Sequence, residues 1–322
     1  MSMDLQQLPL WLNSVIIVCS MAIVSAGAHW IVESATRLSR RLGISELVIG
    51  LTVVALGTSA PEFAVTIIAA FKGQGDISIG NIVGSNIFNL GFILGGCAMV
   101  RAIPVSRSLW RNSVVVLGGT TLLLLLMIGH NLRLDRPEGI LLATLLVIYL
   151  GYLVMGRQDD DLPDQAVEET VQWPLIATCG LLLLGFVFII GGSHLLVVSA
   201  TEVARYFGVS EWVIGVTVVA AGTSVPEFAT SLVGVMKGRF AMSAGNVIGS
   251  DIFNLLGVLG VAGTLTPIGV DPIARISLAA LCGMVLLLLF FMRTGWRISR
   301  FEGFLLILVA ALRWYFDFSA RS

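Results

Sequence analysis

The chain has 322 residues, of which 57% are hydrophobic and 12% are charged, and its formal net charge is −1. Soluble domains carry about twice that share of charged residues, so the composition excludes an ordinary water-soluble protein. A nearly neutral chain also lacks the basic face that a nucleic-acid-binding protein needs.

Apolar stretches of roughly 17–25 residues recur along the chain, and each is long enough to cross a hydrocarbon core about 30 Å thick. The sequence therefore predicts an all-α membrane protein with ten transmembrane helices, multi-pass in the plasma (inner) membrane. Because no basic residue precedes the first apolar stretch, we expect this stretch to remain as a span and not to be cleaved as a signal peptide. The expected spans, in chain order, are 12–36, 47–71, 77–99, 112–130, 138–155, 173–200, 211–236, 241–264, 273–292 and 302–318.

The longest polar connection, residues 157–172, lies midway along the chain and contains three consecutive aspartates that begin at Asp159. We interpret it as a solvated acidic linker between two five-helix halves, residues 1–156 and 173–322. Lys and Arg are more frequent in the loops that follow the odd-numbered spans, and basic loops of membrane proteins face the cytoplasm. This bias predicts that both termini lie outside and that the linker faces the cytoplasm.

An internal repeat relates the two halves. Residues 45–90 align with residues 210–255 at a constant offset of 165 and without a gap. Unrelated apolar helices would not match in their polar residues, as these segments do. Five crossings separate the two copies, an odd number, so the halves should form an inverted repeat with a site near the membrane midplane. The matches include Gly-Thr-Ser-x-Pro-Glu-Phe-Ala at 57–64 and 222–229, and Gly-Asn-x-x-Gly-Ser-x-Ile-Phe-Asn-Leu at 80–90 and 245–255.

Glu62 and Glu227 are the acidic residues of the first repeated motif. An ionised carboxylate in mid-membrane costs at least ~2.5 kcal/mol on insertion scales, so two of them need a counter-charge. No Lys or Arg within the predicted spans is placed to pair with either residue, which makes a bound cation the natural partner. The alternative is a protonated structural Glu that is hydrogen-bonded across helices.

The residues around each Glu offer hard oxygen ligands. Pro61 and Pro226 lack an N–H group and so free the carbonyl groups of Gly57 and Gly222 from helical hydrogen bonds. Calcium takes about 6–8 oxygen ligands from carboxylates, carbonyls and water. Interhelical hydrogen bonding is the alternative role of the hydroxyl groups. Hydroxyl and amide oxygens come from Thr58, Ser59, Thr223 and Ser224, and from two Ser–Asn pairs that each share a helix face, Ser85 with Asn89 and Ser250 with Asn254.

These paired motifs resemble the sodium/calcium exchangers of the calcium:cation antiporter superfamily, in their prokaryotic form. The resemblance covers nearly the whole chain and implies two inverted five-helix repeats. It also implies that Glu62 and Glu227 ligate calcium, and that hydroxyls, amides and two backbone carbonyls complete the calcium and sodium sites. The implied ligands are Ala55, Thr58, Ser59, Glu62, Ser85, Asn89, Ala220, Thr223, Ser224, Glu227, Ser250 and Asn254.

Some positions depart from the family pattern or from the internal repeat. Potassium-dependent relatives are among the members that carry Asp at the position of Asn254, which weakens a potassium-coupled interpretation. Asp251 stands where the first copy has Asn86, about 100° around the helix from the preceding Ser. It is therefore a possible further ligand, or it lines the access path. His29 and His194, also paired by the offset, are either interhelical residues or proton-linked gates.

The sequence predicts a secondary active antiporter that exchanges Na⁺ for Ca²⁺ by alternating access. The alternative is a Ca²⁺/H⁺ exchanger, although proton-coupled relatives usually carry Gly-Asn-x-x-Glu in place of Gly-Thr-Ser-x-Pro-Glu. A cation channel, from another class, suits an inverted pair of broken helices less well. Motifs such as His-Glu-x-x-His are missing, so we expect no enzyme and no cofactor. The expected partners are Ca²⁺ and Na⁺ as substrates and the lipid bilayer, without nucleic acid or an obligate protein partner.

Overall fold

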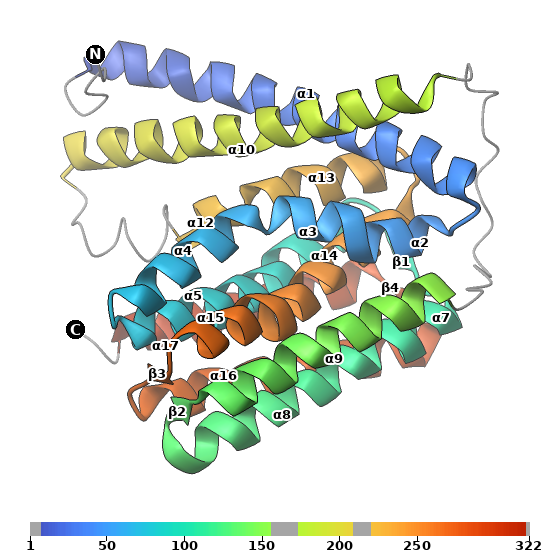
Figure 1. The fold of residues 1–322 in the computed structure, drawn as a ribbon. Helices are drawn as coiled ribbons and strands as arrows, with labels where there is room; N and C mark the ends of the chain where they lie inside the picture. The colour runs from blue at the N-terminus through green and yellow to red at the C-terminus, as the bar shows by residue number, and fades with distance from the viewer. Residues whose placement is uncertain (1–7, 156–172, 209–219, 320–322) are drawn as a thin grey trace.

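The computed structural model describes residues 8–155, 173–208 and 220–319. Most of these residues lie in helices (Figure 1). In the first half the α-helices are α1 (Leu10–Leu42), α2 (Glu46–Ile49), α3 (Ala55–Thr58), α4 (Ala60–Phe71), α5 (Gly75–Phe88), α6 (Gly95–Val100), α7 (Arg107–Leu109), α8 (Val115–Asn131) and α9 (Arg136–Met155). In the second half they are α10 (Leu175–Tyr206), α12 (Ala220–Thr223), α13 (Val225–Met236), α14 (Phe240–Ile252), α15 (Leu259–Leu265), α16 (Ile273–Gly295) and α17 (Arg300–Ser319). Short π-helical segments are η2 (Gly50–Val54), η3 (Asn89–Leu94), η4 (Trp110–Val114) and η6 (Phe253–Val258).

Several of these helices can cross a membrane, which confirms a helical membrane protein. A bent pair, Glu46–Thr58 with Ala60–Phe71, would add one more span, and Val115–Ile128 and Val225–Met236 are shorter apolar helices. The predicted number of ten stays a prediction, because the start of the span expected at 211–236 lies outside the described residues, as does the acidic linker. Within the described residues, six stretches are long and apolar enough to span, namely Leu10–Leu42, Gly75–Val100, Arg136–Met155, Leu175–Tyr206, Phe240–Leu265 and Ala274–Gly295.

The helices α1 and α10 form a layer of their own beside the remaining helices (Figure 1). They pack closely along their length, because a Cβ atom on Gly27 of α1 would lie only 2.9 Å from the carbonyl oxygen of Gly185 in α10. Val24, Ile31 and Ile189 belong to a buried cluster that also includes Ile49 of α2, Val54 of η2 and Met242 of α14. The layer is therefore packed against the helices beside it as well as within itself.

The main core is built around α5 and α14. The apolar part of Phe240–Leu265 is 83% buried and that of Gly75–Val100 is 72% buried, against 28% for Leu175–Tyr206 in α10. These two stretches carry the second repeated motif, so the motif lies at the centre of the molecule.

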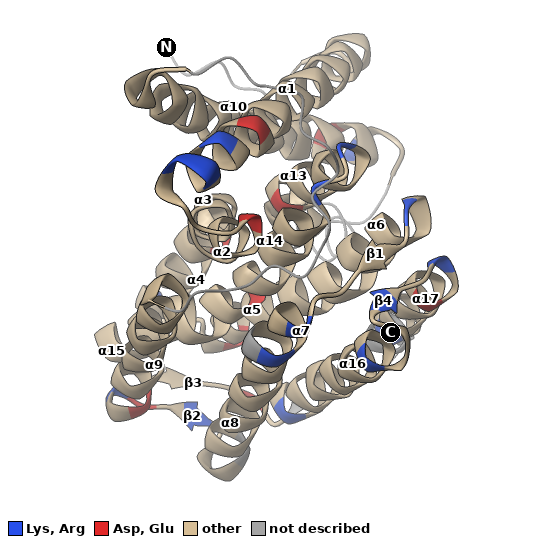
Figure 2. Cartoon of the chain, turned by 90° about the vertical axis from the view of Figure 1, so that its right-hand side faces the viewer, with Lys and Arg blue, Asp and Glu red and all other residues tan. Residues whose placement is uncertain are grey.

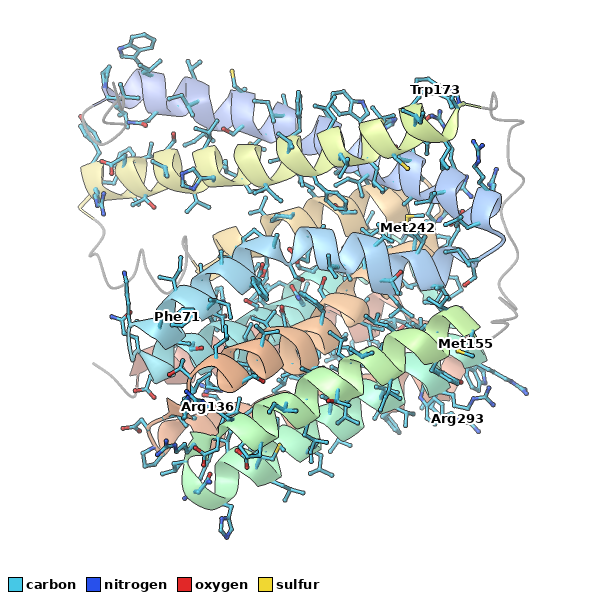
Figure 3. The ribbon with its side chains drawn as sticks, in the orientation of Figure 1. Phe71, Arg136, Met155, Trp173, Met242 and Arg293 are labelled. Atoms are coloured by element: carbon cyan, nitrogen blue, oxygen red, sulfur yellow. The ribbon has the colours of Figure 1, made fainter. Side chains whose placement is uncertain are left out.

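The outer surface is apolar along the helices and charged near their ends. Val147 of α9 and Ile176 and Leu183 of α10 are among the exposed hydrophobic side chains. Met155, at the end of α9, and Trp173, just before α10, are also exposed and are labelled in Figure 3. Lys and Arg lie mostly near helix ends (Figure 2). This distribution matches a protein that lies in lipid with its ends in water.

Two short strand pairs tie the halves together. β1 (Ile103–Pro104) pairs antiparallel with β4 (Arg297–Ile298), and β2 (Arg133–Leu134) pairs antiparallel with β3 (Ile268–Gly269). Each pair joins one strand of the first half to one of the second, so the two halves are interlocked.

Both helices that carry a Glu motif are broken at the expected place. Ser59 separates α3 from α4 with φ −79° and ψ 9°, and Pro61 follows in the first turn of α4. The helical segments on the two sides of this break are bent by 51°. Ser224 separates α12 from α13 with φ −91° and ψ 8°, again with a proline, Pro226, in the next turn. Because proline lacks the N–H group that would continue the helical ladder, both interruptions follow from the sequence.

Candidate functional site

Glu62 and Glu227 each lie in the first turn of the helix that follows a break, Glu62 in α4 and Glu227 in α13. Both side chains are fully buried. The free N–H groups at a helix N-terminus place partial positive charge near a carboxylate, an effect worth about 0.3–1 kcal/mol. That is less than the cost of burying an ionised carboxylate in a membrane, so the helix ends alone do not stabilise both charges.

Each Glu is hydrogen-bonded to a serine of the opposite half. Ser59 Oγ donates to Glu227 Oε1 at 2.9 Å, and Ser224 Oγ donates to Glu62 Oε1 at 3.0 Å. The other carboxylate oxygen of each Glu, Oε2, is buried and has no hydrogen-bond partner within the part of the chain that the structure describes. The two broken helices therefore meet at one centre, which we call the paired-Glu centre (Glu62, Glu227, Ser59 and Ser224).

Further predicted ligands lie beside this centre. Thr58 Oγ1 donates to Asn246 Oδ1 at 3.2 Å and is also 3.1 Å from the carbonyl oxygen of Val54. Ser250 Oγ is 3.5 Å from the carbonyl oxygen of Ala55. The structure thus brings residues of η2, α3 and α14 together around the paired-Glu centre.

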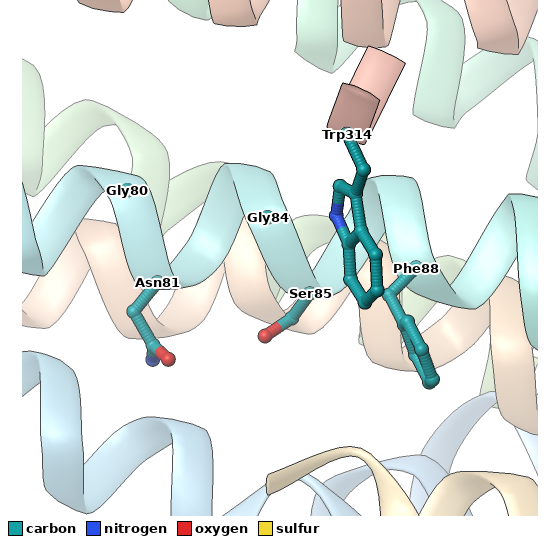
Figure 4. Close-up of a pocket in the computed structure, with 6 residues that line it drawn as sticks. All are labelled: Gly80, Asn81, Gly84, Ser85, Phe88 and Trp314. Atoms are coloured by element: carbon teal, nitrogen blue, oxygen red, sulfur yellow. The ribbon is translucent and has the colours of Figure 1, made fainter. Parts of the chain in front are cut away.

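The remaining predicted ligands are Ser85 and two residues of α12. Ser85 is 3% exposed on α5. Ala220 and Thr223 are the first and last residues of α12, the short helix before the second break. Figure 4 shows a pocket beside the site, lined by Gly80, Asn81, Gly84, Ser85, Phe88 and Trp314.

Two asparagines that we did not predict as site residues hold the Glu-bearing helices in place. Asn81 Nδ2 donates to the backbone oxygen of Glu62 at 3.3 Å and to Thr66 Oγ1 at 3.0 Å. Asn246 Nδ2 donates to the backbone oxygen of Glu227 at 3.4 Å and to Ser231 Oγ at 2.9 Å. The signal was present in the sequence, because the offset of 165 pairs Asn81 with Asn246 and also pairs their hydroxyl partners.

Asn89 and Asn254 lie in a second polar group, which includes Asp251 and Asn86. All four side chains are buried. Asn89 Nδ2 donates to Asp251 Oδ1 at 2.9 Å, and Asn254 Nδ2 donates to Asn86 Oδ1 at 3.1 Å. Asn86 Nδ2 donates to the backbone oxygen of Asp251 at 3.1 Å. Asp251 is therefore hydrogen-bonded directly to a predicted ligand.

The buried carboxylates have no cationic partner among the described side chains. No ion pair between described residues includes Glu62, Glu227 or Asp251. Acidic residues lie among α5, α13 and α14, whereas Lys and Arg lie mostly near helix ends (Figure 2). Carboxylate, hydroxyl and carbonyl oxygens without a protein cation are the ligands that Ca²⁺ and Na⁺ require.

The serine bonds lead to a prediction for cation affinity. Ser59→Ala and Ser224→Ala each remove a hydroxyl oxygen and its hydrogen bond to a buried carboxylate, a contact worth roughly 1.5–3 kcal/mol. We expect the half-saturating Ca²⁺ concentration for uptake by the reconstituted protein to rise about tenfold, which corresponds to ~1.4 kcal/mol. Ser14→Ala is the matched control, because Ser14 is exposed and bonds only its own helix, at Leu10. Unchanged affinity in both site variants would contradict the assignment.

Comparison with known proteins gives consistent matches over most of the chain. A family model described as "Sodium/calcium exchanger protein" matches residues 12–155 and 178–318. The chain is 36% identical over 273 residues to the inner membrane protein YrbG of Escherichia coli, covering 82% of this chain and 83% of YrbG. It is 29% identical over 334 residues to the sodium/calcium exchanger MaX1 of Methanosarcina acetivorans, covering 92% and 95%. Its fold matches the sodium-calcium exchanger NCX_Mj soaked with 2.5 mM Na⁺ and 0.1 mM Ca²⁺, with a TM-score of 0.81, 30% identity and coverage of 94% and 97%.

Proposed function

Since the chain belongs to the family of sodium/calcium exchanger proteins, which are transporters and not enzymes, we propose that it exchanges Na⁺ for Ca²⁺ as a secondary active antiporter. The main observation in support of this proposal is the paired-Glu centre. Glu62 and Glu227 are fully buried, and each accepts a hydrogen bond from a serine of the other half, Glu62 from Ser224 and Glu227 from Ser59. Among the described residues, neither glutamate forms an ion pair with a cationic side chain. Their combined charge of −2 neutralises one Ca²⁺ or two Na⁺, so the two ions compete for the same oxygens.

We propose that the ligands of both ions are the residues that the sequence indicated. Ca²⁺ and Na⁺ are substrates in this proposal, and the lipid bilayer is the only other partner, with no cofactor. The unpaired carboxylate oxygens of Glu62 and Glu227 support it. The proposed set is Ala55, Thr58, Ser59, Glu62, Ser85, Asn89, Ala220, Thr223, Ser224, Glu227, Ser250 and Asn254.

The architecture that we propose is two inverted five-helix repeats, residues 1–156 and 173–322, with ten spans in the inner membrane and both termini outside. Two hydrogen bonds between the halves support the repeat, Ser59 to Glu227 and Ser224 to Glu62. The offset of 165 converts one of these bonds into the other. A second feature common to the two halves is a hydrogen bond from a backbone N–H group to a Glu carboxylate at the start of the helix that follows a strand, α9 after β2 and α17 after β4. Glu138 accepts a hydrogen bond from the backbone N–H of Asp135, and Glu302 accepts one from that of Ser299, each at 2.7 Å.

Alternating access would come from movement of the α1–α10 layer across the main core. The close packing of α1 against α10 supports such movement, since the two helices can move together as one layer. One polar contact that would have to change joins Lys237, at the end of α13, to His29 of α1, with Nζ and Nε2 3.0 Å apart. Burial lowers the pKa of the Lys237 ammonium. This contact suits an interhelical role for His29, whereas the role of His194 stays open.

A Ca²⁺/H⁺ exchanger is the second candidate, because the same two glutamates can bind protons in place of Na⁺. The neutral hydroxyl oxygens of Ser59 and Ser224 favour Na⁺, since a proton needs only the carboxylate whereas Na⁺ needs several oxygens around it. The names of MaX1 and NCX_Mj describe sodium/calcium exchangers, which also favours Na⁺ for this relative of theirs.

Uptake of ⁴⁵Ca²⁺ into proteoliposomes separates the two candidates. A tenfold outward Na⁺ gradient supplies about 1.4 kcal/mol per ion, so we expect Ca²⁺ to accumulate in Na⁺-loaded vesicles and not in choline-loaded ones. Uptake that ignores Na⁺ and follows a pH gradient would replace our proposal with Ca²⁺/H⁺ exchange. Protein-free vesicles with the same gradients report the passive leak.

A further inference from the structure

The two strand pairs lie at opposite ends of the molecule (Figure 1), and the internal repeat makes these ends equivalent. Arg136, which follows β2, and Arg293, which precedes β4, are labelled at opposite ends in Figure 3. The offset of 165 relates residues 100–111 and 293–303, which contain β1 and β4, to residues 265–276 and 128–138, which contain β3 and β2. A difference in charge between the two ends therefore comes from the side chains and not from the fold.

The two equivalent ends differ strongly in charge. The segments with β1 and β4 contain six arginines and one glutamate, which gives a formal charge of +5. The segments with β2 and β3 contain three arginines and three acidic residues, which gives a charge of 0. Blue segments for Lys and Arg accordingly gather at α7, α16, β4 and α17 (Figure 2). The six arginines, which we call the arginine cluster, are Arg101, Arg107, Arg111, Arg293, Arg297 and Arg300.

The arginine cluster is exposed and lacks acidic partners. All six side chains are exposed. The single glutamate of this end, Glu302, already accepts hydrogen bonds from the backbone N–H and the hydroxyl of Ser299, each at 2.7 Å. At the opposite end, by contrast, Arg133 Nε lies 2.6 Å from Asp135 Oδ1 in an ion pair. Within the part of the chain that the structure describes, no ion pair includes Arg101, Arg107, Arg293, Arg297 or Arg300.

The indole ring of Trp296 holds two members of the cluster in fixed positions. The guanidinium carbon atoms of Arg107 in α7 and Arg293 in α16 lie over this ring, 5.6 and 5.2 Å from its centroid. The ring of Trp110 meets it edge-on, with the two centroids 6.3 Å apart. A guanidinium that is stacked on an aromatic ring keeps its N–H donors available for a phosphate group. The cluster is therefore partly organised before any ligand binds.

An exposed apolar surface adjoins the cluster along α16. Leu286 and Phe290 are 65% and 62% exposed, and together with Arg293 they are spaced at i, i+4 and i+7. These three side chains therefore lie on one face of the helix. Phe301, next to Arg300 in α17, is 69% exposed. An apolar stripe that ends in cations fits a phospholipid, whose acyl chains lie along the helix while its phosphate stays at the helix end.

We propose that the arginine cluster and the adjoining face of α16 bind an anionic phospholipid, with the phosphate at Arg293 and an acyl chain along Leu286 and Phe290. Guanidinium groups bind phosphate oxygens through parallel N–H donors. Basic surfaces next to membrane spans also attract anionic headgroups by their charge, whereas the cationic group of a zwitterionic lipid opposes that attraction. The inference goes beyond the proposed function and does not depend on it, because the cluster contains none of the proposed ion ligands.

The test compares two double variants that change the charge equally. Binding of dioleoyl-phosphatidylglycerol to the purified, delipidated protein in a neutral detergent is measured by native mass spectrometry. We expect Arg107→Ala/Arg293→Ala to weaken binding about tenfold, which corresponds to ~1.4 kcal/mol. Arg133→Ala/Arg136→Ala, at the end that contains β2 and β3, should bind as tightly as the wild type. An equal loss in the two double variants, or no loss in either, would overturn the proposal.

Trp296→Leu tests the same site while keeping every charge that orients the chain in the membrane. Leucine suits this turn, because Leu132 ends α8 with φ 58° just as Trp296 ends α16 with φ 50°. We expect phosphatidylglycerol to bind about fivefold more weakly, since Arg107 and Arg293 lose the ring on which they are stacked. Wild-type affinity in this variant would overturn the proposal.

Two competitors separate a lipid site from a site for charge or acyl chains alone. Dioleoyl-phosphatidylcholine has the same acyl chains without a net charge, and glycerol 3-phosphate has the anionic group without acyl chains. We expect each to displace phosphatidylglycerol at least about tenfold less well than phosphatidylglycerol itself does, which corresponds to ~1.4 kcal/mol. Equal displacement by either competitor would overturn the proposal. Since no transport is measured, a failure of Na⁺-driven Ca²⁺ uptake would leave these results unchanged.

Discussion

Replacing Glu62 or Glu227 with Gln should abolish Na⁺-driven Ca²⁺ uptake in reconstituted protein. Each substitution removes one of the two charges of the paired-Glu centre while keeping the shape of the side chain. Two unit charges 4 Å apart interact by about 4 kcal/mol at an effective dielectric constant of 20. The loss of one carboxylate therefore lowers Ca²⁺ affinity by more than ~100-fold, a factor that corresponds to about 2.7 kcal/mol.

The same variants should fold at least as well as the wild type. A buried carboxylate without a bound cation destabilises the protein, and a neutral amide removes that cost. The thermal midpoint in Ca²⁺-free buffer should thus be equal or higher, whereas the rise of this midpoint on adding Ca²⁺ should disappear. Glu202→Gln is the control, because Glu202 forms an ion pair with Arg205, three residues along the same helix α10, and such pairs contribute only about 0.2–0.5 kcal/mol. Retained uptake in both site variants would remove Glu62 and Glu227 as ligands.

Gly249→Ala should destabilise the protein and impair transport. A Cβ atom at Gly249 of α14 would lie 2.7 Å from both the Cα and the carbonyl oxygen of Leu51 in η2. Because the obstructing atoms are backbone, the two helical segments must move apart. Overpacking of this kind costs roughly 1–3 kcal/mol. The movement also separates Ser250 from the carbonyl group of Ala55, so the site is distorted directly.

The expected readouts are a thermal midpoint lower by several degrees and a reduced rate of ⁴⁵Ca²⁺ uptake. Gly151→Ala is the matched control on α9, where no described atom other than those of its own helix backbone and chain neighbours lies within 4 Å of an added Cβ. Alanine has the higher helix propensity, so this control should keep or slightly raise stability. A Gly249→Ala protein with wild-type stability and uptake would show that α14 and η2 can separate without cost.

The fold class and the Glu motifs were predictable from local features. Composition placed the chain in a membrane, and Pro61 and Pro226 predicted breaks that the structure has at Ser59 and Ser224. These predictions succeed because they depend on residues next to each other in the chain. The predicted number of ten spans stays a prediction, because α13 is shorter than a full span and part of the span predicted at 211–236 lies outside the described residues.

Contacts between helices could not be predicted in the same way. Helical periodicity says which residues share a face, but not which other helix meets that face. Nothing in the motif indicated that Ser59 bonds Glu227 and not the nearby Glu62. Asn81 and Asn246 were missed for the same reason, since their role depends on the packing of α5 on α4 and of α14 on α13.

The sequence alone determined that this is a membrane protein with paired carboxylates, because hydropathy, the repeated motifs and the prolines can be read directly from the chain. Its resemblance to the exchangers came from the same paired motifs. Only the tertiary structure decided how those carboxylates are partnered. It pairs each Glu with a serine of the other half and leaves one oxygen of each unpaired among the described residues. It also places Asn89 Nδ2 2.9 Å from Asp251 Oδ1, a hydrogen bond that could not be predicted from either helical segment alone because it depends on how the two segments pack.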